Sequence, residues 1–166
     1  MRNTLEKIVV NTSFGKLATS APEFEAKLLP EIKESFAAIT GQAGQERTAR
    51  ISISGFKIRE GMIIGLKATL RGKKMHQFLA RLIAIVMPRI RDFHGFPTRS
   101  IDERGNLTLG VREHIVFPEI VLEKVRANFG IEITLVPRTA MTNYKAIEFY
   151  RGIGIPFEKV VAKKQK

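Results

Sequence analysis

The sequence predicts an α+β protein in two layers, an antiparallel sheet with helices packed on one face. Strand-like and helix-like segments intermix without the regular strand–helix–strand repeat that builds a parallel sheet. The clearest strand, residues 62–71, alternates strictly and has one apolar side, which is typical of a sheet with one covered and one open face. The clearest helix, residues 73–92, carries an apolar stripe in its first half and is apolar nearly all round in its second. One layer of helices therefore covers one side of the sheet.

The other elements follow from the same patterns. A helical pattern runs from Phe24 to Ile39, and because Pro30 interrupts it we expect a kink or two short helices. Ser20 and Pro22 are expected in the N-cap region and first turn of that helix, after a loop at 14–20. Pro88 is expected to kink or stop the helix at 73–92. The remaining predictions are strands at 5–13, 49–54, 107–113 and 131–137, a loop at 92–106, a short helical piece near 119–129 and a helix at 142–151.

Composition indicates one domain over residues 1–157, followed by a basic tail at 158–166. The chain has 166 residues, 44% of them hydrophobic, which is enough for a core. It has no cysteine, so disulfides, thiolate metal sites and a cysteine nucleophile are excluded. The longest apolar run, 82–87, is far shorter than the about 20 residues of a membrane span. We expect a cytoplasmic protein with no membrane partner.

The charge distribution favours a polyanionic partner. The chain has 28 basic and 16 acidic residues, a net charge of +12. Between Arg47 and Arg91 there are eleven Lys or Arg residues and one acid, Glu60. Solvated surfaces normally mix signs because like charges repel, although charge for solubility alone remains the alternative. The polar side of 62–71 offers Lys67, Thr69 and Arg71, suitable for phosphates and sugar hydroxyls. With no Trp and two Tyr, structured RNA fits better than stacked single strands.

No catalytic, metal or cofactor site is predicted. The three histidines, His76, His94 and His114, show no metal-ligand spacing. Asp92 with His94, and Glu113 with His114, are weak candidates for acid–base pairs, and no glycine-rich nucleotide-binding motif is present. The alternative function is a small RNA-acting enzyme or an RNA chaperone that uses the basic segment.

Three stretches resemble a known family: "GFKIREGMIIGLKATLRG" (55–72), "RLIAIVMPRIRDFHG" (81–95) and above all "DERGNLTLGVREHIVFPEI" (102–120). They are similar to the bacterial large-subunit ribosomal protein number five, over about 7–157. The resemblance implies an antiparallel sheet with helices on one side and a structural role in the large ribosomal subunit. Its implied partners are 5S rRNA in the central protuberance, large-subunit rRNA, peptidyl-site tRNA through a basic loop, and a small-subunit protein across an intersubunit bridge.

Carried onto this sequence, the resemblance implies 5S rRNA contacts at Asn11, Gln42 and Thr69. The tRNA-facing loop matches 48–61, with Arg50, Lys57 and Arg59 as its cations, and Phe56 either anchors this loop or contacts tRNA. Arg112 is expected to be a bridge or rRNA contact. To the 5S rRNA site we add the cations Lys7, Lys67 and Arg71.

The chain also departs from the family pattern. Family members usually begin with a helical segment that is absent before the first strand here. Ile51 stands where Lys is common and Ile63 where Pro is common. The stretch between Asn11 and Gln42 is a few residues longer than usual.

Overall fold

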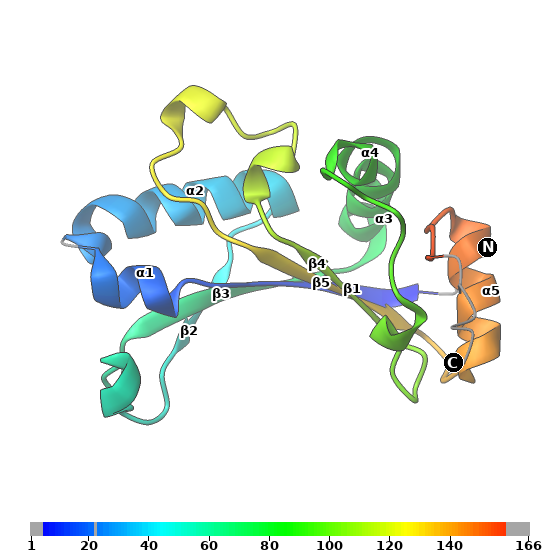
Figure 1. The fold of residues 1–166 in the computed structure, drawn as a ribbon, viewed down its shortest axis with the longest axis horizontal. Helices are drawn as coiled ribbons and strands as arrows, with labels where there is room; N and C mark the ends of the chain where they lie inside the picture. Colours follow the sequence, from blue (N-terminus) through cyan, green and yellow to red (C-terminus); the bar gives the residue numbers. More distant parts are fainter. Residues whose placement is uncertain (1–4, 22, 159–166) are drawn as a thin grey trace, which may run out of the picture.

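A five-stranded antiparallel sheet forms the centre of the protein in a computed structural model that describes residues 5–21 and 23–158 (Figure 1). The strands lie in the order β2-β3-β1-β5-β4, so the first strand of the chain is the central one. Their bounds are β1 Leu5–Ser13, β2 Gln45–Thr48, β3 Ile63–Leu70, β4 Leu107–Val111 and β5 Ile131–Pro137. Every neighbouring pair is antiparallel.

The longer helices lie on one side of this sheet, α2 (Leu29–Thr40) above β3 and α3 (Gly72–Arg81) beside it (Figure 1). Both are parts of longer helical paths, in which the wide turns η1 (Phe24–Leu28) and η3 (Leu82–Val86) precede α2 and follow α3. Two more helices are α1 (Gly15–Ser20) and α4 (Met87–Arg89), and α5 (Asn143–Ile153) packs at the far end of the sheet. Single 3-10 turns are η2 (Ser54–Phe56), η4 (Thr98–Ser100), η5 (His114–Val116) and η6 (Leu122–Lys124). In the described part of the chain, none of these helices has the length and apolar character needed to cross a bilayer.

The core lies between the sheet and these helices because β1, β3, β4 and β5 bury mainly alternate side chains, whereas all four side chains of the edge strand β2 are exposed. On β1 and β3 the buried side chains include Ile8, Val10, Leu66 and Leu70. They belong to one apolar cluster that also contains side chains of α2 and α3, Ile32, Phe36, Met75 and Phe78. This arrangement confirms the predicted α+β architecture with helices on one face.

The two prolines behave as predicted from their ring geometry. Pro30 lies at the start of α2, where no helical N–H is needed, after the wide turn that begins at Phe24. Pro88 lies in the last helical turn before the chain becomes extended at Ile90.

The predicted strand at 49–54 is wrong. The edge strand is β2 at 45–48, and Ile51 and Ile53 are exposed over 70% and 46% of their surface. Their alternation is typical of a half-buried strand, but these residues extend past the end of β3, where no helix layer covers them. The alternation of apolar residues along the chain does not show whether a layer of helices packs against them.

Three other boundaries differ from the prediction. Residues 15–20 form α1 rather than a loop, so Ser20 ends a helix and donates its hydroxyl to the Lys16 carbonyl oxygen (2.8 Å). Pro22 lies outside the described residues. β4 ends at Val111 rather than at residue 113, and the helical piece expected near 119–129 is reduced to the single turn η6. The division into a domain at 1–157 and a tail stays a prediction, because 159–166 lie outside the described residues.

Candidate nucleic-acid interface

The side of the sheet that faces away from α2 and α3 is mainly polar, and in the part of the chain that the structure describes neither of these helices covers it; we call it the open face. Strand register places its side chains in rows across the sheet. One row consists of Gln45, Lys67, Asn11, Glu132 and Gly110, each directly opposite the next. The neighbouring row consists of Thr69, Val9, Thr134 and Thr108. The open face therefore combines cations, amides and hydroxyls from five strands.

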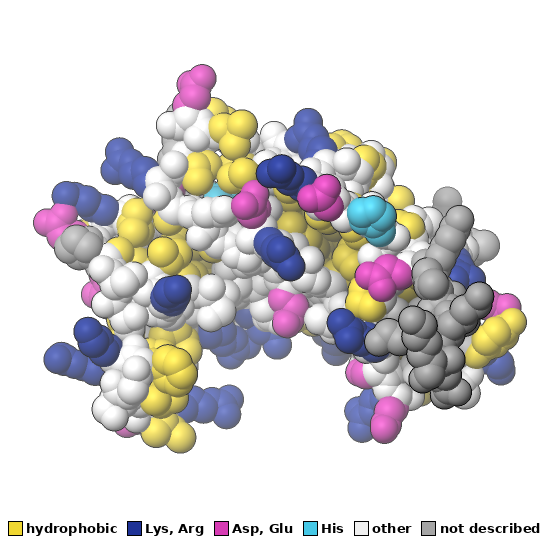
Figure 2. All heavy atoms as spheres, viewed as in Figure 1, with side chains coloured by type: hydrophobic (Ala, Val, Ile, Leu, Met, Phe, Trp, Pro, Cys, Tyr) yellow, Lys and Arg dark blue, Asp and Glu magenta, His cyan; other side chains and the backbone are white. Residues whose placement is uncertain are grey.

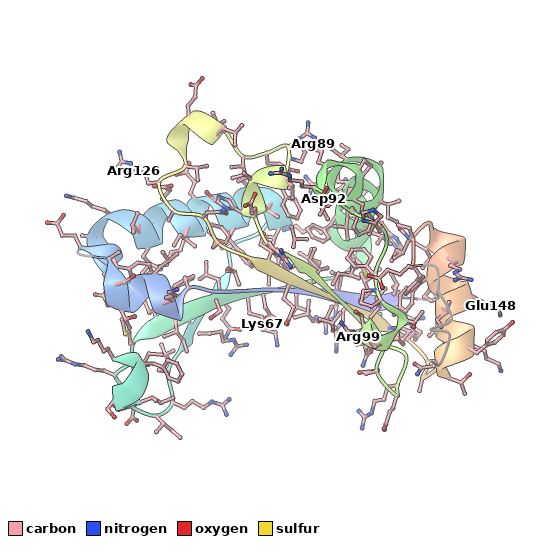
Figure 3. The ribbon with its side chains drawn as sticks, viewed as in Figure 1. Lys67, Arg89, Asp92, Arg99, Arg126 and Glu148 are labelled. Carbon is pink, nitrogen blue, oxygen red and sulfur yellow. The ribbon has the colours of Figure 1, made fainter. Side chains whose placement is uncertain are left out.

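Two cations of this face, Lys67 and Arg71, have no carboxylate partner among the described residues. Lys67 points away from the helices (Figure 3), and Arg71 follows the last residue of β3 in extended conformation. Among the described residues, no carboxylate lies within ion-pair distance of either side chain. Lys7, at the other end of β1, contacts the neighbouring Glu6 at 3.3 Å between Nζ and Oε1. Figure 2 shows Lys and Arg side chains gathered on the underside, where the surface is hollowed beneath the sheet.

Gln42 reaches the open-face residues from the helix layer. Gly41 ends α2 in the left-handed region, with φ of 70°, which turns the chain back toward the sheet. The Gln42 amide then donates to the main-chain oxygen of Thr69 (3.2 Å). Asn11 is the diagonal neighbour of Thr69, because Asn11 pairs with Lys67 across the strands. The structure thus brings together Gln42, Thr69, Asn11 and Lys67.

The 48–61 loop is a separate hairpin at the edge of the sheet. Ile53 and Ile58 exchange both main-chain hydrogen bonds, and the Ala49 N–H donates to the Met62 carbonyl. Arg50, Lys57 and Arg59 are all exposed on it. Phe56 is 70% exposed, so it does not anchor the hairpin in the core. The hairpin extends from the β2–β3 edge of the sheet, on the side away from α2 (Figure 1).

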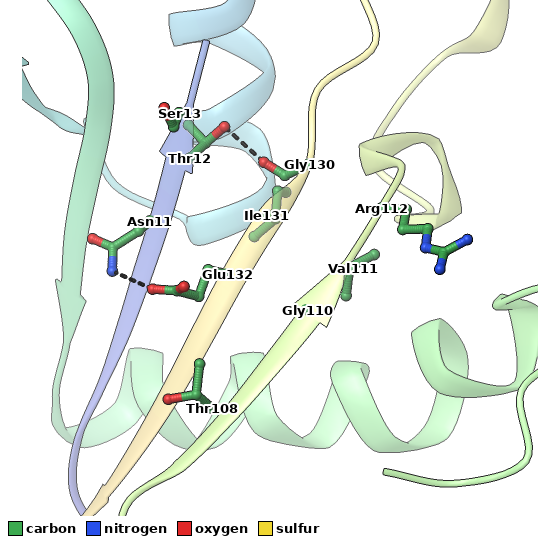
Figure 4. Close-up of a pocket in the computed structure, with 10 residues that line it drawn as sticks. All are labelled: Asn11, Thr12, Ser13, Thr108, Gly110, Val111, Arg112, Gly130, Ile131 and Glu132. Atoms are coloured by element: carbon green, nitrogen blue, oxygen red, sulfur yellow. Dashed lines mark hydrogen bonds between the residues drawn. The ribbon is translucent and has the colours of Figure 1, made fainter. Parts of the chain in front are cut away.

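Arg112 lies at the opposite edge of the sheet, just after β4. It borders a surface hollow of about 560 Å³ at the end of β1, β4 and β5 (Figure 4). The hollow also contacts Asn11, Thr108, Gly110 and Glu132. Arg112 is therefore separated from the cations of the 48–61 hairpin by the width of the sheet.

The contacts of His94 and His114 differ from the acid–base pairs considered in the sequence. Within the described residues, no three His, Cys, Asp or Glu side chains gather to hold a metal ion. His94 contacts the main-chain oxygen of Asp92 rather than its carboxylate (2.8 Å). His114 is buried, stacks on Phe129 with ring centroids 4.0 Å apart, and hydrogen-bonds to Asn128 (3.2 Å). Burial lowers the pKa of His114 more than the hydrogen bond to Asn128 and nearby carboxylates raise it.

Comparison with known proteins identifies the family of this chain. A profile of the ribosomal L5P family C-terminus matches residues 63–157, more than half of the chain. The chain belongs to the ribosomal L5P family. The relatives include proteins named large ribosomal subunit protein uL5. Those of Rubrobacter xylanophilus and Halothermothrix orenii are 48% and 45% identical over 93% of this chain, which is 82% and 83% of their own lengths. The protein of Streptococcus sanguinis is 44% identical over 93% of this chain and 83% of its own length.

Membership of the L5P family confirms the resemblance seen in the sequence. It also confirms the prediction of a ribosomal protein located in the ribosome, rather than an RNA-acting enzyme.

Several open-face residues of this L5P-family chain were not predicted from the sequence. They are Gln45, Arg47, Thr108, Thr134 and Glu132, which come from three other strands. Each occupies an outward position of its strand, so period-two alternation could have placed it on the polar side. Only the pairing order shows that these residues lie beside Lys67 and Asn11.

Proposed function

We propose that this chain is a structural constituent of the large ribosomal subunit and binds 5S rRNA with the open face of its sheet. The observation that carries the proposal is the asymmetry of the sheet. One face of β1, β3, β4 and β5 is used for the core, whereas the other offers Lys67 and Arg71, which have no carboxylate partners among the described residues, beside Thr69, Asn11 and Gln42. Such a row of cations does not stabilise the fold, because like charges repel one another, but it attracts a polyanion.

The two kinds of side chain suit different parts of RNA. Lys67 and Arg71 lie four residues apart on one side of an extended chain, about 13 Å, and each can neutralise a separate phosphate. Thr69, Asn11 and Gln42 are neutral and both donate and accept hydrogen bonds, so they suit sugar hydroxyls and base edges. Phosphate contacts position the RNA, and the neutral groups recognise its irregular parts. Lys7 adds a weaker contact, since Glu6 partly neutralises it.

The remaining sites belong to other partners in this proposal. The 48–61 hairpin contacts peptidyl-site tRNA through Arg50, Lys57 and Arg59. Its hydrogen-bonded frame supports this role, because it holds three exposed cations beyond the sheet edge. Arg112, at the other edge, is a contact to large-subunit rRNA or to a small-subunit protein in the intersubunit bridge.

The test is the salt dependence of binding to a bacterial 5S rRNA transcript, measured by filter binding. If about five phosphates are neutralised, log Kd plotted against log salt concentration should change with a slope of about 4 in magnitude. Changing Lys67 and Arg71 together to Ala should reduce that slope by about 1.4–1.8. The matched control changes Arg89 and Arg126, which lie on the helix side (Figure 3), and should leave the slope unchanged. A wild-type protein without salt dependence would rule out the open face as a phosphate-binding surface.

A further inference from the structure

The open face contains a carboxylate that a phosphate-binding surface does not explain. Glu132 lies in the row that includes Lys67 and Asn11, and its side chain is exposed. Of the nine residues in the two open-face rows, it is the only acid. Its Oε1 accepts a hydrogen bond from Asn11 Nδ2 (3.2 Å). Next to an RNA backbone this negative charge repels phosphates. Glu132 can therefore favour RNA binding only if the RNA offers it a hydrogen-bond donor.

The space beside Glu132 is large enough for such a donor. The residue directly opposite on β4 is Gly110, and a Cβ built there would meet no atom within 4 Å. The missing side chain opens the hollow of about 560 Å³ in which Asn11, Glu132 and Thr108 point toward a common space (Figure 4). This volume is within the roughly 300–1,000 Å³ of small-ligand pockets. The hollow is open on the side from which the proposed RNA approaches.

We propose that this hollow is a base-reading site that receives an unpaired guanine of the bound RNA, with Glu132 accepting hydrogen bonds from the guanine N1–H and N2–H groups. An ionised carboxylate only accepts hydrogen bonds, and its two oxygens have about four lone-pair positions, so Asn11 leaves room for two more donors. Guanine is the standard base whose pairing edge offers two adjacent donors. Asn11 orients the carboxylate, and Arg112 at the rim lies within reach of the flanking phosphate. The site rests on the proposed function, because the RNA must lie on the open face.

The substitution Glu132→Gln distinguishes hydrogen bonding to a base from a general effect of charge on RNA binding. Removing a negative charge from a cationic face strengthens phosphate binding, so electrostatics alone predicts tighter binding. Base reading predicts the opposite, because one acceptor becomes a donor facing the guanine N–H groups. We expect the affinity for the 5S rRNA transcript to fall about tenfold, as for one lost hydrogen bond to a charged group. The control Glu123→Gln removes the same charge from η6, on the helix side, and should not weaken binding.

A second variant, Gly110→Val, tests the shape of the hollow. Gly110 lies in a strand with open space at its Cβ position, so a β-branched residue fits without strain and the thermal stability should be kept or raised. The valine side chain fills the hollow beside Glu132, and binding should again fall about tenfold or more. A folded Gly110→Val protein that binds as tightly as wild type would show that no base enters the hollow.

Kethoxal footprinting identifies the base, because kethoxal reacts with N1 and N2 of unpaired guanine. Wild-type protein should protect at least one such guanine, and Glu132→Gln should lose that protection while keeping the phosphate contacts. Tighter or unchanged binding by Glu132→Gln with the same footprint overturns the base-reading site and leaves the proposed function standing. Dimethyl sulfate, which reacts with unpaired adenine N1 and cytosine N3, tests the other bases: a protection lost in Glu132→Gln only at adenine or cytosine overturns the assignment to guanine. If wild-type protein does not bind the transcript, the proposed function fails, and this site with it.

Discussion

Replacing Thr69 with Val is the most direct test of the neutral groups on the open face. The exchange keeps the β-branched shape and removes one hydroxyl from the middle of β3, opposite Val9. Among the described residues the Thr69 hydroxyl has no hydrogen-bond partner, and the bond from Gln42 goes to the Thr69 main-chain oxygen. The substitution therefore breaks no bond within the protein, and the melting temperature should stay within about 2 °C of wild type.

The effect on RNA binding follows from the hydrogen bond that the hydroxyl makes in the complex. Removing one partner of a bond that becomes buried on binding costs about 1–3 kcal/mol. This corresponds to a roughly five- to 140-fold rise in Kd. Asn11→Ala on the same face should give a similar loss, and because the two residues are diagonal neighbours the double variant should show less than the sum of the two effects.

Filter binding to 5S rRNA over a range of salt concentrations distinguishes this loss from a loss of charge. Thr69→Val should shift the line of log Kd against log salt upward without changing its slope, since no phosphate contact is removed. Lys67→Ala, its matched control on the same strand, should reduce the slope by about 0.7–0.9. Wild-type affinity for the combined Thr69→Val and Asn11→Ala protein would refute the reasoning, and the cations would then act elsewhere.

Two further predictions concern the hairpin and the buried histidine. Changing Arg50, Lys57 and Arg59 together to Ala should leave the affinity for 5S rRNA unchanged, apart from a small electrostatic loss. The same change should impair retention of peptidyl-site tRNA on assembled ribosomes. A large loss of 5S rRNA binding would contradict the proposed role of the hairpin. Burial holds the pKa of His114 below the ordinary 6.5, so the unfolded chain binds more protons at this residue than the folded protein does as the pH falls through about 6.5. The free energy of unfolding, measured in urea, should therefore fall between pH 7.5 and 5.5 in wild type and fall less in His114→Gln; equal pH dependence in both would contradict this assignment.

The elements that the sequence predicted well are those whose signal is local. The alternation in 62–71 and the stripe in 73–92 depend on neighbours within a few residues, and both appear in the structure as β3 and as the path from α3 to α4. The strand expected at 49–54 has the same kind of alternation but is an exposed hairpin, because the helix layer does not extend over it. Binary patterning records which residues could be buried, whereas burial itself depends on what packs against them.

Some features of the candidate site were predictable from the sequence, and others required the tertiary structure. The charge excess, its concentration between Arg47 and Arg91, and the outward side of β3 were all present in the sequence, because charge adds along the chain and side-chain direction alternates with each residue. Only the tertiary structure placed Glu132 and Gly110 in one row with Asn11 and Lys67, since the strand order β2-β3-β1-β5-β4 joins segments more than a hundred residues apart. Strand pairing is a non-local choice made by the whole core, and a shift of one residue would turn every open-face side chain inward. Sequence alone determined which groups are available for RNA, and packing of the sheet on its helices decided which of them meet.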